Sequence, residues 1–141
     1  MDLDYEDLNN SRILNLITFD EISELLNKGM DIQLHTNRHT FPENAEAAAE
    51  EIEKNRLLIH PYLPKTQTPF CYPSGVWSKN HWPVFEKLGV HTATTCEPKL
   101  IYYDTPNYSL DRILDGSNLS QIEYEAEVSG FNEIISVVRG K

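Results

Sequence analysis

Residues 30–42, Met-Asp-Ile-Gln-Leu-His-Thr-Asn-Arg-His-Thr-Phe-Pro, place two histidines directly after a short apolar segment. The run at 32–34 predicts a short buried strand, and His35 and His39 follow where that strand ends and a loop begins. In a parallel α/β fold, functional residues gather at the carboxyl ends of the strands. Two imidazoles with three residues between them can bind one divalent metal ion, because neutral imidazole is a common zinc ligand. The spacing alone is equally compatible with a histidine pair that binds nothing.

Helical patterns lie on both sides of this segment. Residues 18–21, Thr-Phe-Asp-Glu, have the spacing of a capping box and predict a helix over 19–28. Residues 43–59 predict a second helix, with apolar side chains on one face and acidic residues near its start, where the helix dipole favours negative charge. Residues 1–12 are polar, and we expect an irregular entry segment there.

The rest of the chain continues the alternation of apolar segments and helical patterns. We expect strands at 70–72, 90–95 and 108–114, a turn at 73–75, a helix at 79–88, and a helix from 120 that breaks near 129–130 and resumes to about 139. This order predicts an α/β fold in which parallel strands alternate with helices through right-handed crossovers. The two histidines, the turn and Cys96 would then all lie past strand ends, at one edge of the sheet.

The composition is that of one soluble globular domain. The chain has 141 residues, a hydrophobic fraction of 40% and a formal net charge of −10, so we expect a single domain over 1–141. The negative charge argues against nucleic acid, because a phosphate-backbone partner needs clustered Lys and Arg, and it disfavours an anionic membrane surface. No stretch approaches the roughly 20 apolar residues that span a bilayer.

The N-terminus and the cysteines bear on the compartment. The first residues are acidic and do not have the pattern of a signal peptide. The two cysteines, Cys71 and Cys96, are too few for a disulfide framework. We therefore expect a reducing compartment, the cytoplasm.

Four short segments carry a resemblance to a known family. They are His-Thr-Asn-Arg-His-Thr-Phe-Pro (35–42), Pro-Phe-Cys-Tyr-Pro-Ser-Gly (69–75), Gly-Val-His-Thr-Ala-Thr-Thr-Cys (89–96) and Leu-Asp-Arg-Ile-Leu-Asp-Gly (110–116). In order and spacing they resemble the polysaccharide deacetylase family, the metal-dependent carbohydrate esterases of the chitooligosaccharide-deacetylase homology domain, over about 18–141. The resemblance implies an incomplete (β/α) barrel of the polysaccharide deacetylase type. It also implies removal of N-acetyl groups from a polysaccharide or glycan precursor.

The same resemblance assigns roles to single residues. It makes His35 and His39 the two histidine ligands of a mononuclear zinc or similar divalent ion, which polarises the acetyl carbonyl and activates a water for attack. It places the backbone N–H that holds the oxyanion at Ser74, and it puts Arg112 at a basic position of a later motif. The expected sugar contacts are Tyr72, Pro73 and Tyr103, the last in a tyrosine-rich loop that could stack on sugar rings.

Three departures from the family pattern bear on activity. Residues 18–21 look like the family's Thr-Phe-Asp-Asp-Gly motif, which holds the general base and the third metal ligand, but they lie too close to His35, lack the glycine and carry helix-start chemistry. We therefore expect the true motif upstream of Met1, so that the chain is the C-terminal two-thirds of the domain. Cys71 replaces the usual arginine, and no histidine follows His91. The activity of this chain alone therefore stays open.

Two other interpretations stay open. One is a non-catalytic metal- or glycan-binding module, in which His35 and His39 join Cys71 and Cys96 in a structural zinc site. The other is an interaction protein on a degenerate barrel, whose unpaired sheet edge would pair with a second copy and give a homo-oligomer. Replacing both cysteines with serine separates the zinc sites, because only the structural site would lose its metal.

Overall fold

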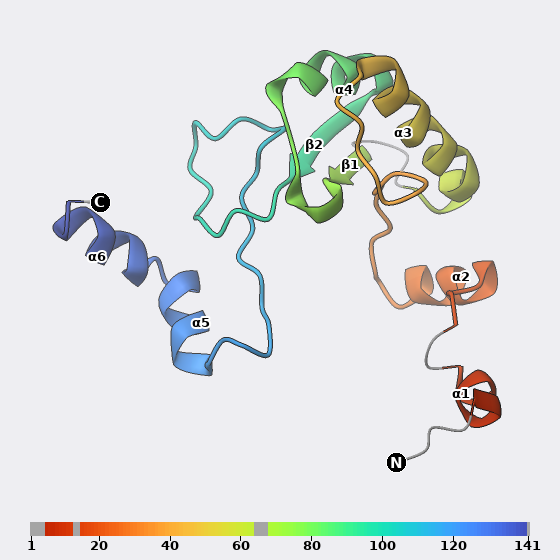
Figure 1. The fold of residues 1–141 in the computed structure, drawn as a ribbon, viewed down its shortest axis with the longest axis horizontal. Coiled ribbons are helices and arrows are strands. Elements are labelled where there is room, and N and C mark those ends of the chain that lie inside the picture. The colour runs from red at the N-terminus through yellow and green to blue at the C-terminus, as the bar shows by residue number, and fades with distance from the viewer. Residues whose placement is uncertain (1–4, 13–14, 64–67, 141) are drawn as a thin grey trace. The chain divides into compact units, whose positions relative to one another are not determined.

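The computed structural model describes residues 5–12, 15–63 and 68–140 (Figure 1). The chain divides into two compact units, termed the N-terminal unit (Met1–Ile32) and the C-terminal unit (Gln33–Lys141). The single domain that we predicted over the whole chain stays a prediction.

Two short helices form the regular structure of the N-terminal unit. They are α1 (Tyr5–Ser11) and α2 (Phe19–Asn27). The prediction that 1–12 is irregular is wrong for α1. Its first turn carries Glu6 and Asp7 at the positive end of the helix dipole, which stabilises the start of a helix. Local charge placement thus favours a helix in a segment that has little apolar surface to bury.

The predicted capping box at the start of α2 is confirmed. The Glu21 N–H donates to Thr18 Oγ1 at 3.3 Å, and the Thr18 N–H donates to Glu21 Oε2 at 2.8 Å. Past the helix end, Gly29 has φ +86° and the Met30 N–H donates to the Leu25 carbonyl, the hydrogen bond of a Schellman motif. The Glu21 carboxylate is therefore engaged in starting a helix, as the sequence indicated.

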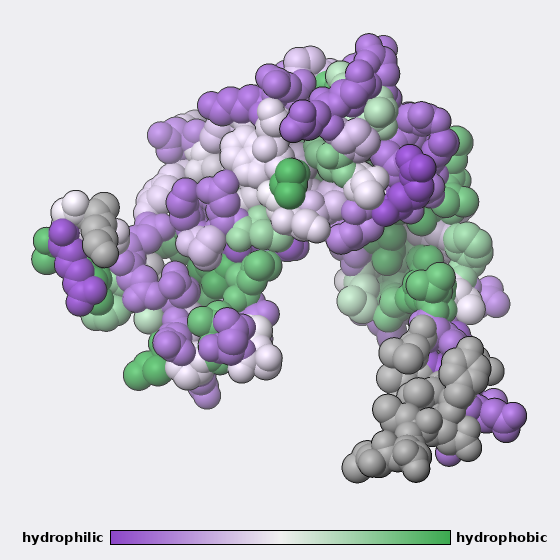
Figure 2. All heavy atoms as spheres, viewed as in Figure 1, coloured by the Kyte–Doolittle hydropathy of each residue, from purple (hydrophilic) through white to green (hydrophobic). Residues whose placement is uncertain are grey.

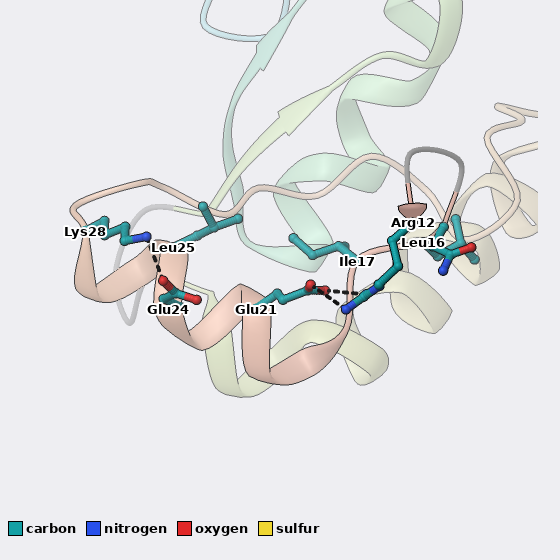
Figure 3. Close-up of a pocket in the computed structure, with 8 residues that line it drawn as sticks. Arg12, Leu16, Ile17, Glu21, Glu24, Leu25 and Lys28 are labelled. Atoms are coloured by element: carbon teal, nitrogen blue, oxygen red, sulfur yellow. Dashed lines mark hydrogen bonds and ion pairs between the residues drawn. The ribbon is translucent and has the colours of Figure 1, made fainter. Parts of the chain in front are cut away.

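A shallow pocket lies along α2 and the residues before it (Figure 3). Two ion pairs line this pocket. Arg12 Nη1 lies 3.1 Å from Glu21 Oε1, and Lys28 Nζ lies 2.6 Å from Glu24 Oε1. Because these four charged side chains pair with one another, the pocket does not concentrate charge of either sign.

The C-terminal unit is built on a parallel sheet, as predicted. Strand β1 (Thr68–Cys71) pairs in parallel with β2 (Val90–Thr94), and Phe70 lies opposite Ala93. Threonine, valine and phenylalanine suit this pleated, half-buried arrangement. The carboxyl ends of both strands therefore meet at the same edge of the sheet.

The outer positions of the sheet are single bridges rather than strands. Leu34 forms a parallel bridge with β1, and Leu110 forms a parallel bridge with β2. The strands predicted at 32–34 and 108–114 are therefore reduced to one paired residue each. The four segments lie side by side in sequence order, and the residues that the structure describes do not close a barrel.

Helices connect and flank these strands. Those described in the C-terminal unit are α3 (Ala45–Ile59), η1 (His60–Tyr62), η2 (Pro73–Gly75), η3 (Lys79–His81), α4 (Trp82–Leu88), α5 (Gln121–Val128) and α6 (Phe131–Val138). They confirm the helices predicted at 43–59 and 79–88 to within a few residues. They also confirm the break near 129–130, where Gly130 has φ +75°. Pro83 lies in the first turn of α4, where no N–H is needed.

A core that combines aromatic and aliphatic side chains joins the sheet to α3 and α4. Its buried members are Leu34, Ile52, Phe70, Tyr72, Phe85, Val90 and Ala93. The ring centroids of Phe70 and Phe85 lie 5.0 Å apart, and Phe41 lies 5.4 Å from Phe70. Phe41 follows the histidine loop (residues 35–39) closely in sequence. The loop is therefore anchored to the same core as the sheet.

The two C-terminal helices expose much apolar surface (Figure 2). The exposed apolar side chains on α5 and α6 include Ile122, Val128, Phe131, Ile134, Val137 and Val138. Glu133 connects α6 to the loop after β2, because it accepts the Leu100 N–H at 3.0 Å and the Tyr102 hydroxyl donates to it. Among the helices of the described residues, none combines the length and apolar character that crossing a membrane requires.

Candidate metal site

His35 directly follows Leu34, the residue that pairs with β1. Its backbone N–H and its ring Nδ1 both form hydrogen bonds. Its backbone N–H donates to Asn55 Oδ1 on α3 at 3.0 Å. Its ring Nδ1 lies 2.7 Å from the Cys71 carbonyl oxygen at the end of β1. A carbonyl oxygen only accepts, so Nδ1 carries the proton. In the neutral ring Nε2 then keeps its lone pair, as a metal ligand must.

His39 lies in a loop with unusual backbone angles. Thr36 has φ +68° and His39 has φ +55°, a left-handed conformation that residues other than glycine seldom adopt. The rings of His35 and His39 have centroids 4.9 Å apart at an interplanar angle of 63°. The Thr36 hydroxyl is buried and has no hydrogen-bond partner among the described residues. Strained backbone of this kind concentrates at functional sites, and this loop brings two imidazoles together.

The turn after β1 has a similar backbone. Ser74 in η2 has φ 55° and ψ 15°, and Gly75 has φ +68°. A Cβ added to Gly75 would lie 2.7 Å from Cys96 Cβ, so the turn packs closely against the residues that follow β2. Ser74 is exposed at this edge of the sheet. Its role as an oxyanion donor stays a prediction.

Arg112 lies beside a thiol rather than a carboxylate in the described structure. Its Nη2 lies 3.6 Å from Cys96 Sγ, and its backbone N–H donates to the Glu97 carbonyl at 3.0 Å. Cys71 and Cys96 are both free and partly buried. The structure thus brings Arg112 to the carboxyl edge of the sheet, and its part in catalysis stays a prediction.

Two of the three predicted sugar contacts are buried. Tyr72 is 1% exposed, and its hydroxyl donates to the Tyr108 carbonyl at 2.8 Å. Burial raises the pKa of Tyr72 well above its ordinary value. Pro73 is buried as well, so we correct both to buried residues. Tyr72 is two residues after Phe70 and therefore shares its face of the strand. Tyr103 is fully exposed, and its contact with a sugar stays a prediction.

The described residues supply two candidate metal ligands rather than a complete site. His35 and His39 fit as imidazole ligands, because Nδ1 of His35 is already engaged and the two rings are close. Within the described ranges, no three side chains of His, Cys, Asp or Glu are grouped to hold a metal ion. The alternative zinc site with both cysteines is therefore not favoured, and Cys96 lies against Arg112. A zinc ion held by the histidines needs further ligands.

Two side chains of α3 hold the histidine loop and were not singled out from the sequence. Glu51 Oε2 accepts the Arg38 N–H at 3.0 Å, and Asn55 accepts the His35 N–H. Glu51 and Asn55 are four residues apart, so they lie on one face of the helix. The burial of Glu51 could have been predicted from the helical periodicity. Glu51 lies three residues after the buried Ala48 and thus on the inner face of α3.

Fold and site together define a class of protein. It is an α/β protein whose parallel sheet presents a pair of histidines near the carboxyl ends of its strands. The family model described as polysaccharide deacetylase matches residues 10–93. The chain belongs to the polysaccharide deacetylase family.

Two known proteins are similar to this chain. The poly-beta-1,6-N-acetyl-D-glucosamine N-deacetylase of Staphylococcus epidermidis is 24% identical over 131 residues, which cover 85% of this chain and 45% of that protein. The structure of the Streptococcus pyogenes deacetylase PplD in complex with acetate matches with a TM-score of 0.69 and 19% identity, over 86% of this chain and 54% of that chain. The chain thus spans about half the length of each of these proteins.

Proposed function

We propose that the chain is the histidine-bearing part of a metal-dependent hydrolase that removes N-acetyl groups from a polysaccharide or glycan precursor. The observation that carries this proposal is the His35–His39 pair at the strand ends, with His35 Nδ1 held by the Cys71 carbonyl. The Staphylococcus epidermidis protein is named for a polymer of N-acetylglucosamine, so such a polymer is the substrate class to test first. Zinc is the metal we expect, because it is commonly bound by imidazole nitrogen.

The side chains and backbone groups of this chain would each have a separate role in the deacetylation. His35 and His39 would bind the metal, which when bound supplies a Lewis acid that polarises the acetyl carbonyl. The Cys71 carbonyl keeps the proton of His35 on Nδ1. The Ser74 N–H would donate to the acetyl oxygen as it becomes negative during addition of water to the acetyl carbon. Breaking the C–N bond then releases acetate and the free amine of the sugar.

The proposal needs a general base and a further metal ligand from outside the described residues. The chain spans about half the length of the two proteins it matches. We propose that further strands of a full-length domain complete the barrel and supply an aspartate pair. A missing base typically lowers the rate by ~10²–10⁴-fold. We therefore expect the isolated chain to bind metal and to turn over slowly.

The test is zinc content measured by elemental analysis after loading and desalting. Wild type should retain about one equivalent, and His35→Ala and His39→Ala should each lose it. His91→Ala is the matched control, because His91 is exposed on β2 and is separate from the histidine loop. Zinc retained in both loop variants would overturn the proposed site, whereas zinc absent from wild type at every loading would show that the two histidines do not retain it without the further ligand.

A second measurement follows the reaction itself. Acetate release from oligomers of N-acetylglucosamine should be slow, dependent on added metal, and absent in His35→Ala. Equal release by wild type and His35→Ala would show that the histidine pair does not carry the activity.

A further inference from the structure

Glu51 is a buried carboxylate next to exposed ones. Its side chain is 2% exposed, whereas the side chain of Glu50 beside it is 63% exposed. Taking a carboxylate out of water is costly unless it is paired and hydrogen-bonded. Glu51 therefore requires partners that its neighbour Glu50 does not.

Arg38, directly before His39, supplies these partners. Its backbone N–H donates to Glu51 Oε2 at 3.0 Å, and its Nε donates to Oε1 at 2.8 Å. Its Nη2 lies 2.6 Å from Oε1, and the Asn37 N–H donates to the Glu51 carbonyl at 3.2 Å. Hydrogen bonds between charged groups are the stronger kind. One residue of α3 thus holds both residues that lead into His39.

A second hydrogen bond to the histidine loop comes from Asn55, one helical turn further along α3. Asn55 Oδ1 accepts the His35 N–H at 3.0 Å, so Glu51 and Asn55 fix opposite ends of the histidine loop. The loop contains positive φ angles at Thr36 and His39, which persist only where surrounding contacts offset their cost. The contacts from α3 are the ones that the structure provides.

We propose that Glu51 is a positioning residue that, through Arg38, holds the histidine loop in the conformation in which His39 faces His35. This inference rests on the proposed function for its purpose, but it concerns the loop before any metal binds. Groups that orient metal ligands typically change metal affinity by 10–100-fold. We expect the loss of the Glu51 contacts to weaken Zn²⁺ binding within that range.

The test compares Glu51→Gln with Glu50→Gln in the full chain. Glutamine keeps the size of glutamate but replaces one carboxylate oxygen with an NH2 donor, so one of the two oxygens that accept from Arg38 is lost. Two readouts are needed: the NOE between the His35 and His39 ring protons in metal-free protein, and the Zn²⁺ dissociation constant by calorimetry. In Glu51→Gln the NOE should disappear and Zn²⁺ binding should weaken by about 10–100-fold. In Glu50→Gln both should stay at the wild-type value, because Glu50 pairs with the exposed Lys54.

A second variant, Arg38→Ala, keeps the test decisive if Glu51→Gln fails to fold. Arg38→Ala removes the guanidinium contacts from a side chain that is 70% exposed, so its urea midpoint should stay near wild type while the NOE weakens. A wild-type NOE and wild-type Zn²⁺ affinity in both variants would overturn the role of Glu51. A wild-type chain that shows the NOE but binds no Zn²⁺ would contradict the expectation that the histidine pair of this chain binds metal by itself. The NOE difference between the variants would still decide whether Glu51 holds the loop.

Discussion

Gly75→Ala is the substitution that tests most directly how the turn after β1 is built. Gly75 has φ +68°, and an added Cβ would lie 2.7 Å from Cys96 Cβ and 3.0 Å from Cys96 Sγ. Alanine therefore has two separate costs. Its backbone must adopt a positive φ, and its Cβ must displace Cys96. Because Ser74 precedes this glycine, the same substitution displaces the N–H that we expect to hold the oxyanion.

The size of the effect follows from these two costs. A left-handed conformation costs a residue with a Cβ about 1–2 kcal/mol. Forcing extra atoms into packed surroundings costs a further ~1–3 kcal/mol. We expect Gly75→Ala to lower the free energy of unfolding by about 2–5 kcal/mol, a large part of the ~5–15 kcal/mol typical of a natural domain.

Gly89→Ala is the matched control, measured by urea denaturation followed by circular dichroism. Gly89 has φ +66° and has nothing within 4 Å of its added Cβ, so only the backbone cost of about 1–2 kcal/mol applies. The loss of chain entropy in the unfolded state is the same for both substitutions and cancels in the comparison. Equal destabilisation by the two alanines would refute the close packing of the turn against Cys96.

Two further substitutions test the core and a helix cap. Tyr72→Phe removes the hydrogen bond to the Tyr108 carbonyl and should cost about 1 kcal/mol in urea denaturation; a stability equal to wild type would contradict the buried contact. The pKa of Glu21 is lowered from 4.5, first by the hydrogen bond from the Thr18 N–H, so the capping contribution is complete above that value and is lost as pH falls through the lowered pKa. Amide chemical shifts of α2 should follow this loss in wild type, and a Glu21→Gln variant that showed the same acid transition would exclude Glu21 as its source.

Local patterns in the sequence predicted much of the fold. The capping box at Thr18, the helix at 43–59 and the break near Gly130 depend on neighbouring residues, whose effects can be read along the chain. The parallel sheet followed from the order of the elements. The position of His35 just past a paired residue followed from the same order. For the capping box, the helix and the break, a short stretch of sequence contains the cause.

The features that the sequence did not predict have two causes. Some depend on contacts between distant residues, and the burial of Tyr72 follows from the two-residue alternation of a strand. The contact of Glu51 with Arg38 joins residues 13 positions apart, and no local pattern records that contact. Tyr72 could have been assigned to the core, because it lies two residues after Phe70 on the same face of a strand. The outer strands shortened to single bridges because their length depends on partners on both sides, which the sequence of one segment does not specify.

The side chain of Asn55 has a consequence for the border of the sheet. Successive backbone groups of a parallel strand point alternately to its two sides. Leu34 faces β1, since its N–H donates to the Pro69 carbonyl and its own carbonyl accepts the Cys71 N–H. The His35 N–H therefore points the other way, where Asn55 receives it. A further strand that paired with the backbone alongside His35 would therefore have to displace the Asn55 amide before the ladder could extend.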